Sequence, residues 1–200
     1  MEYSIGFRPF EEGDIDFVYK CKNDEKLNSM IVGQFRPFSY QDAEQWVRGV
    51  IRADRKDMKF WAICTNDSDR RIIGWESISE IDLDIKSACH HGLVIGDPEY
   101  KDGTAMFEAM LFAMDYVFSR LKLHRLYGSC LAEHKISPFL LRALGFVQEG
   151  QKRDAYYKNG AYYDILDFGI LDEDYYNNMK KGAYKLPVLI KNFLKSLKTL

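Results

Sequence analysis

The sequence predicts a single-domain fold of the mixed α/β (α+β) class, built on a mostly antiparallel sheet. Short segments of strand-type alternation recur along the chain, and one pair is joined by the turn-rich Asn66-Asp67-Ser68-Asp69. Two strand-then-helix units follow, at 89–117 and 126–144. Strand runs joined to two such units favour an open mixed sheet over a Rossmann arrangement. A length of 200 residues with 46% hydrophobic content is enough for one domain with its own core.

The first elements are a strand and two helices. Residues 3–8 alternate apolar and polar side chains, as a strand does, and Asp14 is expected to cap a helix over 15–21. Ser39 followed three residues later by Asp42 resembles an acidic capping box that opens a second helix.

The middle of the chain is predicted to contain a hairpin, a strand and a long helix. Residues 59–65 and 71–79 form the hairpin, and the strand at 89–95 ends before Pro98, which has no backbone donor. From Thr104 the apolar spacing becomes helical, at Met106, Ala109, Met110, Ala113, Met114 and Val117.

Four short elements close the domain. We expect a strand at 126–131, a helix at 137–144 stopped by Gly145, and strands at 146–151 and 162–171. The turn before the last strand, Lys158-Asn159-Gly160, contains an Asn-Gly pair that suits positive φ.

The tail from Lys180 to Leu200 differs in composition, because it contains lysines and no acidic residue. Leu189, Ile190, Phe193, Leu194 and Leu197 form an apolar stripe on a helix expected to begin near Pro187. Two interpretations stay open: a terminal helix docked on the domain or on a second subunit, and a membrane-surface anchor.

Charge and cysteine usage exclude several classes of protein. The 28 basic and 30 acidic residues leave a formal charge of −2, so nucleic acid is not an expected partner. Four widely spaced cysteines lack zinc-ligand or disulfide spacing, and no metal site is expected. The sequence has no signal-peptide pattern and no run of about 18 apolar residues, which predicts a cytoplasmic protein.

Several motifs together resemble one family. The central stretch is Gly92-Leu93-Val94-Ile95-Gly96-Asp97-Pro98-Glu99-Tyr100-Lys101, followed by Glu108-Ala109 and Asp115-Tyr116-Val117-Phe118. Further stretches that fit are Arg8-Pro9, Leu144-Gly145-Phe146-Val147-Gln148-Glu149-Gly150 and Tyr157-Lys158-Asn159-Gly160. In this order the motifs resemble the GNAT acetyltransferases, in particular the subgroup that acetylates ribosomal-protein N-termini, spermidine or nucleotide-linked amino sugars. The resemblance implies a GNAT domain over 1–171, with about seven strands splayed in the middle and about four flanking helices, followed by an extension over 172–200.

The resemblance also implies acetyl-CoA as the acyl donor and direct transfer to a primary amine in a ternary complex. The expected cofactor-binding residues are Leu93, Val94, Ile95, Lys101, Asp102, Gly103, Thr104, Ala105, Met106, His134 and Ser137. In the family a strand like 89–95 splays from its neighbour and bonds the pantetheine, while a loop at a helix N-terminus donates amides to the diphosphate. This chain departs from the family's Gln/Arg-X-X-Gly-X-Gly/Ala loop: both motif glycines are replaced, by Thr104 and Met106, and Gly103 stands one place early. A helix cap is the plainer role for Ser137.

Two residues are candidates for the base that takes a proton from the amine. His90 aligns with a glutamate that many relatives use, and its alternative is a plain polar residue at a strand start. Glu76 lies inside an apolar strand, and its alternative is the exposed face of an edge hairpin. The family's asparagine and acidic tyrosine align with His134 and Leu141, so the tyrosine is missing.

The acceptor is expected between the first helices and the last strands, near Phe35, Arg36, Tyr156, Tyr157 and Tyr162. Aromatic side chains with few fixed charges suit an amino sugar or a peptide terminus better than a polyamine. A catalytically weak or inactive GNAT-fold binding protein is the alternative function, and a homodimer stays open.

Overall fold

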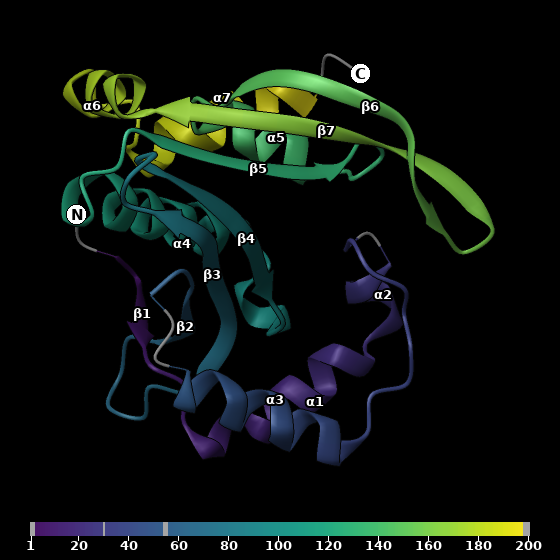
Figure 1. Ribbon diagram of the computed structural model, residues 1–200. Helices are drawn as coiled ribbons and strands as arrows, with labels where there is room; N and C mark the ends of the chain where they lie inside the picture. The colour runs from purple at the N-terminus through teal and green to yellow at the C-terminus, as the bar shows by residue number, and fades with distance from the viewer. Residues whose placement is uncertain (1–2, 30, 54–55, 198–200) are drawn as a thin grey trace.

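A computed structural model describes residues 3–29, 31–53 and 56–197. Its sheet has seven strands in the order β1-β2-β3-β4-β5-β7-β6, and only the β4–β5 pair is parallel (Figure 1). The predicted mixed and mostly antiparallel sheet is confirmed. The strands are β1 (Ile5–Arg8), β2 (Lys59–Thr65), β3 (Ile72–Asp82), β4 (Ser87–Ile95), β5 (Arg125–Leu131), β6 (Val147–Lys158) and β7 (Ala161–Leu171).

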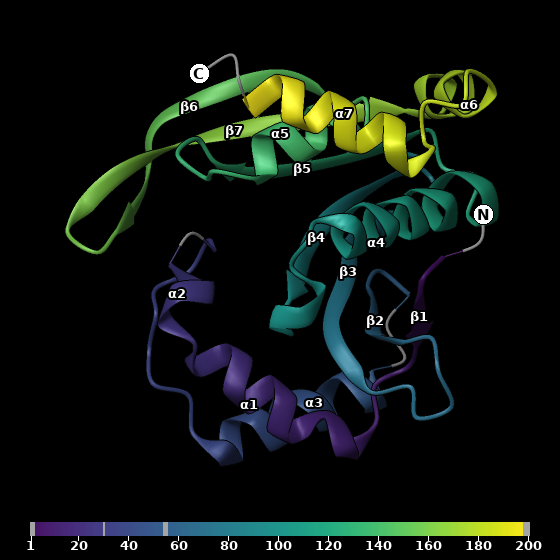
Figure 2. The same ribbon diagram turned by 180° about the vertical axis from the view of Figure 1, so that it is seen from behind.

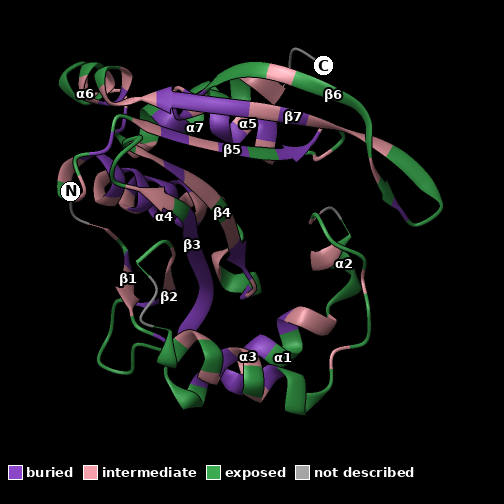
Figure 3. Cartoon of the chain, in the orientation of Figure 1, coloured by how far each residue is buried: buried purple, intermediate pink, exposed green. Residues whose placement is uncertain are grey.

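Helices cover the sheet on both faces. They are α1 (Ile15–Asn23), α2 (Glu25–Asn28), α3 (Tyr40–Arg52), α4 (Thr104–Asp115), α5 (Ser137–Ala143), α6 (Asp172–Lys180) and α7 (Leu186–Leu197). Helices α1 and α3 share a core cluster with Trp75 and Val94 of the central strands. Helix α4 packs on the opposite face, with Ile73 and Ile95, and α5 and α7 lie in front of the C-terminal strands in Figure 2. The central strand β3 is therefore buried on both faces from Ile72 to Ser79 (Figure 3).

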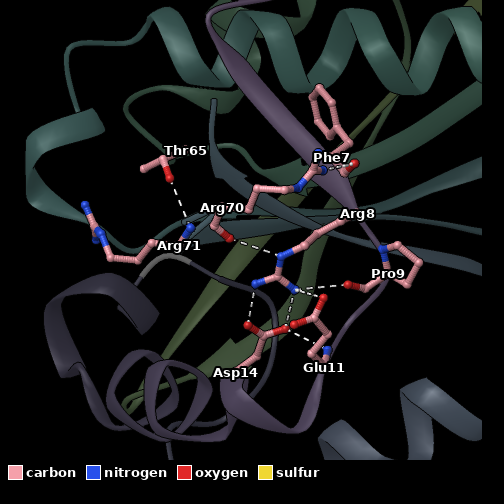
Figure 4. Close-up of polar contacts among 8 residues, drawn as sticks. All are labelled: Phe7, Arg8, Pro9, Glu11, Asp14, Thr65, Arg70 and Arg71. Atoms are coloured by element: carbon pink, nitrogen blue, oxygen red, sulfur yellow. Dashed lines mark hydrogen bonds and ion pairs between the residues drawn. The ribbon is translucent and has the colours of Figure 1, made fainter. Parts of the chain in front are cut away.

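Arg8, the first residue of the Arg8-Pro9 motif, ties three segments together (Figure 4). Its guanidinium donates to both oxygens of Asp14, at 2.8 and 2.7 Å, and to the carbonyl oxygen of Arg70 at 3.1 Å. Asp14 is 2% exposed and also accepts from the amide of Glu11 at 2.9 Å. The prediction that Asp14 caps the following helix is wrong, because its carboxylate is used by Arg8 and by the preceding turn.

Local signals in the sequence correctly located three features: a helix start, a hairpin and a turn. Ser39 and Asp42 form the predicted capping box at the start of α3. The β2–β3 hairpin is present, and Asn159 and Gly160 both adopt positive φ, at 50° and 84°, in the two-residue β6–β7 turn. These elements depend on nearby residues, which is why sequence reasoning located them.

Helix α4 begins at Thr104, as predicted, after Gly103 at φ 95°. It continues as a π-helical turn from Tyr116 to Arg120. Glu108, 3% exposed, accepts from the backbone amide and the hydroxyl of Ser4 at 2.9 Å each and from the amide of Ile5 at 3.2 Å. This carboxylate holds the start of β1 against α4.

The C-terminal third extends beyond the prediction. Strand β6 runs to Lys158 rather than stopping at 151, and α6 was not predicted. Four helices, α1, α3, α4 and α5, flank the sheet as expected, while α2 is a single turn. Helix α7 begins within one residue of the predicted Pro187 and buries Leu189, so the tail docks on the domain. Lys198 and Leu200 of the predicted tail lie outside the described residues.

The β6–β7 hairpin projects beyond the sheet and its tip curves back toward α2 (Figure 1). Lys158, 1% exposed, donates to the carbonyl oxygens of Asn28 and Ile31 at 2.7 and 2.5 Å. Gln34 donates to the carbonyl oxygen of Tyr157 at 2.6 Å. Burial lowers the pKa of Lys158. These bonds join the hairpin tip to the chain between α2 and α3.

Over the residues that the structure describes, no helix is both long and apolar enough to span a bilayer. Within the same residues, no group of three His, Cys, Asp or Glu side chains is arranged to hold a metal ion.

Candidate functional site

Strands β4 and β5 separate in the middle of the sheet, as the fold prediction requires. They pair only from Ser87–Arg125 to Cys89–Tyr127, whereas β4 continues to Ile95 on β3, and β5 continues to Leu131 on β7. Beyond Cys89 the edge of β4 that faces β5 has no ladder partner in the part of the chain that the structure describes. Free backbone amides and carbonyls on such an edge can bond an extended amide-containing ligand as an added strand would.

The N-terminus of α4 lies at the end of this gap, after β4 and the loop that follows it. Gly103 makes the turn into the helix, and the first amides of a helix lack intrahelical acceptors and favour anions. One of them is already used, because Asp102 accepts from the amide of Thr104 at 2.9 Å and from its hydroxyl at 3.2 Å. Asp102 is exposed, so its side chain is free to turn away. Met106 is half-buried against two core clusters, and Ala105 is 2% exposed.

The start of α5 is capped by His134 and not by Ser137. The Nδ1 atom of His134 accepts from the amides of Ile136 and Ser137, at 3.1 and 3.0 Å. Ser137 is the first helical residue, so its predicted role as a helix cap is wrong. Burial lowers the pKa of His134, which agrees with a neutral ring that accepts at Nδ1. Leu141, at the position of the family's tyrosine, is 6% exposed and belongs to the core.

The two candidate bases lie side by side. The Nε2 atom of His90 is 2.8 Å from Oε1 of Glu76, although the ring N–H does not point at that oxygen. Glu76 is fully buried, and burial raises its pKa while His90 opposes the rise. The alternative that Glu76 lies on an exposed edge hairpin is therefore wrong. His90 stands where β4 leaves β5 and its side chain is 14% exposed.

Gly128 in β5 was missed by the sequence analysis. A Cβ atom at this position would lie 3.4 Å from Cβ of His90 and 3.2 Å from its carbonyl oxygen. Glycine therefore lets β5 approach the His90 side chain closely. The signal was available in the sequence as a glycine inside a strand pattern.

The predicted acceptor residues come from two segments that the structure brings together. Phe35 and Arg36 follow Gln34, which is bonded to Tyr157 of the hairpin. The rings of Tyr157 and Tyr162 are 5.0 Å apart and are 53% and 65% exposed. Tyr156 and Phe35 are half-buried, and Arg36 is exposed.

Comparison with known proteins identifies the family of this fold. A family model of the acetyltransferase (GNAT) domain matches residues 4–147. The chain belongs to the GNAT acetyltransferase family. It is an acetyl-CoA-dependent N-acetyltransferase, and its acceptor is an amine.

Among relatives of this GNAT protein, spermidine N(1)-acetyltransferase of Vibrio cholerae is 26% identical over 178 residues, covering 88% of this chain and 98% of the relative. The [ribosomal protein uS5]-alanine N-acetyltransferase of Escherichia coli is 30% identical over 96 residues, or 48% of this chain and 49% of that protein. The crystal structure of the V. cholerae spermidine N-acetyltransferase in complex with CoA and spermine superposes with a TM-score of 0.74 at 25% identity, covering 87% of this chain and 99% of that one.

Proposed function

We propose that acetyl-CoA lies in the gap between β4 and β5, where the backbone of Leu93, Val94 and Ile95 holds the pantetheine. The observation that supports this proposal is the end of β4–β5 pairing at Cys89, while β4 continues to Ile95 and is followed by the loop that leads into α4 at Thr104. The loop Lys101–Met106 would hold the diphosphate through its amides, with Asp102 turned outward. His134 and Ser137, at the start of α5, would border the pantetheine from the β5 side.

Bound acetyl-CoA supplies an acetyl group as a thioester, which an amine attacks only in its neutral form. Because a lysine-like amine has a pKa of about 10.4, the protein must take up a proton near neutral pH. His90 is the proposed acceptor of that proton, since a neutral imidazole accepts a proton readily and His90 stands at the gap. With Leu141 at the tyrosine position, the leaving sulfur takes its proton from solvent.

The acceptor is proposed to be a small-molecule amine without further positive charges, such as an amino sugar. The exposed cation of Arg36, two residues after the Gln34 that bonds Tyr157, disfavours a polycation, and the aromatic rings of Tyr157 and Tyr162 suit a sugar. Asp164, two residues after Tyr162, already accepts from the side-chain amide of Gln151 and from the backbone amide of Asp154. A peptide N-terminus is the second candidate, because a relative carries that activity in its name.

Calorimetric titration with acetyl-CoA and a free-thiol assay over a panel of amines test the proposed function. We expect binding, and release of CoA with amino sugars above that with spermidine. A higher rate with spermidine would overturn the proposed acceptor class while leaving donor binding intact. Donor binding without thiol release from any amine would favour the alternative of an inactive binding protein.

The remaining assignments concern the extension and the cell compartment. We propose residues 1–171 as the acetyltransferase domain and 172–200 as its extension. In this proposal α7 packs on the domain and does not bind a membrane surface. Leu189 is buried there, and Phe193 contacts Phe107 of α4 with ring centroids 5.7 Å apart. Co-sedimentation with anionic liposomes would contradict this, and sedimentation analysis would decide whether the chain forms a homodimer.

The cell compartment is proposed to be the reducing cytoplasm, which the four unpaired cysteines support.

A further inference from the structure

Glu76 is a buried carboxyl group whose bonding capacity is incompletely used. It is 0% exposed, and the strand register sets it between Trp61 and Leu93 on the face that α4 covers. Its Oε1 atom accepts from the amide of Ser77 at 3.1 Å and lies 2.8 Å from Nε2 of His90. Its Oε2 atom has no hydrogen-bond partner among the described residues. An unsatisfied buried oxygen costs about 1–3 kcal/mol, so fold stability does not explain this residue.

A β-bulge brings His90 to this carboxyl group. In the β3–β4 ladder Ser77 pairs with Gly92 and Ile78 pairs with His90, so His91 is the extra residue. The bulge moves His90 to the face of Leu93 and Glu76, whereas a regular strand would put it on the face of Gly92 and Val94. Bulges that redirect a side chain in this way are frequent beside active sites.

The contact distinguishes the two ring nitrogens of His90. The nitrogen that faces Glu76 is Nε2, and it is buried. The exposed 14% of the side chain therefore belongs to its other atoms, among which are Nδ1 and Cβ. A carboxylate beside Nε2 favours the tautomer that carries its proton there, which leaves the lone pair on Nδ1.

We propose that Glu76 is a positioning residue, which fixes the His90 ring with Nε2–H toward the core and Nδ1 toward the gap as the proton acceptor. This inference rests on the proposed function. In the step, one amine proton moves to Nδ1 of His90, the amine nitrogen keeps the electron pair for attack, and the imidazolium faces the Glu76 carboxylate. The two groups thus act in series, and Glu76 does not touch the amine.

The N–H of His90 does not point at Glu76 Oε1, which agrees with a ring that has not yet formed its hydrogen bond to Glu76. Hydrogen bonds of catalytic groups are often poorly aligned in ligand-free proteins and tighten when substrate binds. Gly128 leaves room for such a rotation, since a Cβ atom at this position would lie 3.4 Å from Cβ of His90 and glycine has none. The competing arrangement is a protonated Glu76 that donates to Nε2, which would put the ring proton on Nδ1 and remove the base.

Nitrogen NMR of the imidazole rings in the ligand-free protein tests the inference without any assay of activity. His134 is an internal reference for a ring with its lone pair on Nδ1, and His124, with Nδ1 2.9 Å from Asp172, is a reference for the opposite bias. We expect neutral His90 to match His134 in the wild type and to become a mixture of tautomers in Glu76→Gln. A wild-type His90 protonated on Nδ1, or one unaffected by Glu76→Gln, would overturn the inference.

Kinetics provide a second readout. Glu76→Gln should lower kcat by about 10²-fold with little change in KM for the amine, and the double variant with His90→Asn should be no slower than His90→Asn alone. The control Asp172→Asn should leave both parameters unchanged. Additive losses in the double variant would overturn the inference. Absence of turnover in the wild type would instead contradict the proposed function and leave the NMR result valid.

Discussion

Two buried carboxyl groups of this protein, Asp14 and Glu76, differ in how their oxygens are bonded. At the β1–α1 corner, Asp14 receives two guanidinium N–H donors from Arg8 and a backbone amide from Glu11, so both oxygens are used. In the centre of the sheet, Glu76 faces His90 off the N–H axis, and its Oε2 has no partner among the described residues. The fully bonded Asp14 carboxylate is typical of a group that stabilises the fold. The Glu76 carboxyl group leaves one oxygen unbonded beside the proposed active site.

Asp14→Asn should give the largest effect, because it removes one charge of a buried pair and leaves Arg8 only the exposed carboxylate of Glu11, 3.9 Å away. We expect the free energy of unfolding to fall by about 3–5 kcal/mol, measured by urea denaturation. The control Glu12→Gln breaks an exposed pair with Arg48 at 3.3 Å and should cost less than about 1 kcal/mol. Equal losses in the two variants would remove the distinction between the buried pair and a surface pair.

His134 extends the comparison to a satisfied group that can titrate. Its neutral ring accepts two amides at the start of α5, and burial lowers its pKa below the unfolded value of about 6.5. The unfolded chain then binds more protons, so this stabilisation is present above pH 6.5 and is lost as the pH falls toward the folded-state pKa. His134→Ala should cost about 1 kcal/mol at neutral pH and show less acid sensitivity in the same denaturation assay. If His134→Ala lost as much stability on acidification as the wild type, the capping role would be contradicted.

Glu76→Gln should cost at most about 1 kcal/mol at neutral pH, in contrast to Asp14→Asn. The pKa of Glu76 is raised by burial, so in the wild type its contribution is present below the unfolded value of about 4.3 and is lost as the pH rises through the folded-state pKa. Glutamine does not titrate, so the stability of the variant relative to the wild type should improve as the pH rises from about 4.3 through neutrality. A constant difference across that range would show that the carboxyl group is ionised throughout.

Asp102→Asn should give the smallest effect and concerns donor binding. Its carboxylate competes for the amide of Thr104 at the helix N-terminus, where such a charge contributes about 0.3–1 kcal/mol. Removing the charge should tighten acetyl-CoA binding by up to about 5-fold in calorimetry. Glu173→Gln, a remote exposed carboxylate, is the control. Weaker binding in Asp102→Asn would argue that Asp102 organises the loop for the diphosphate.

The sequence by itself determined the elements that depend on neighbouring residues. The Ser39–Asp42 capping box, the Asn159-Gly160 turn and the helix from Thr104 follow from backbone preferences and apolar spacing within a few residues. The order of these elements, with the motifs around Gly92–Lys101, also predicted the family and the splayed sheet.

Tertiary structure decided how the site is assembled. In a regular β4 strand, alternation would put His90 on the face opposite to Leu93, the residue that pairs with Glu76. Only the bulge at His91, which forms when β4 pairs with β3, brings His90 and Glu76 to one face. The burial of Glu76 depends on α4 and on both neighbouring strands, and the capping by His134 on the path of the turn before α5. The physical reason is that a side chain's face and partners depend on contacts with chain segments distant in sequence, which periodicity within one segment does not encode.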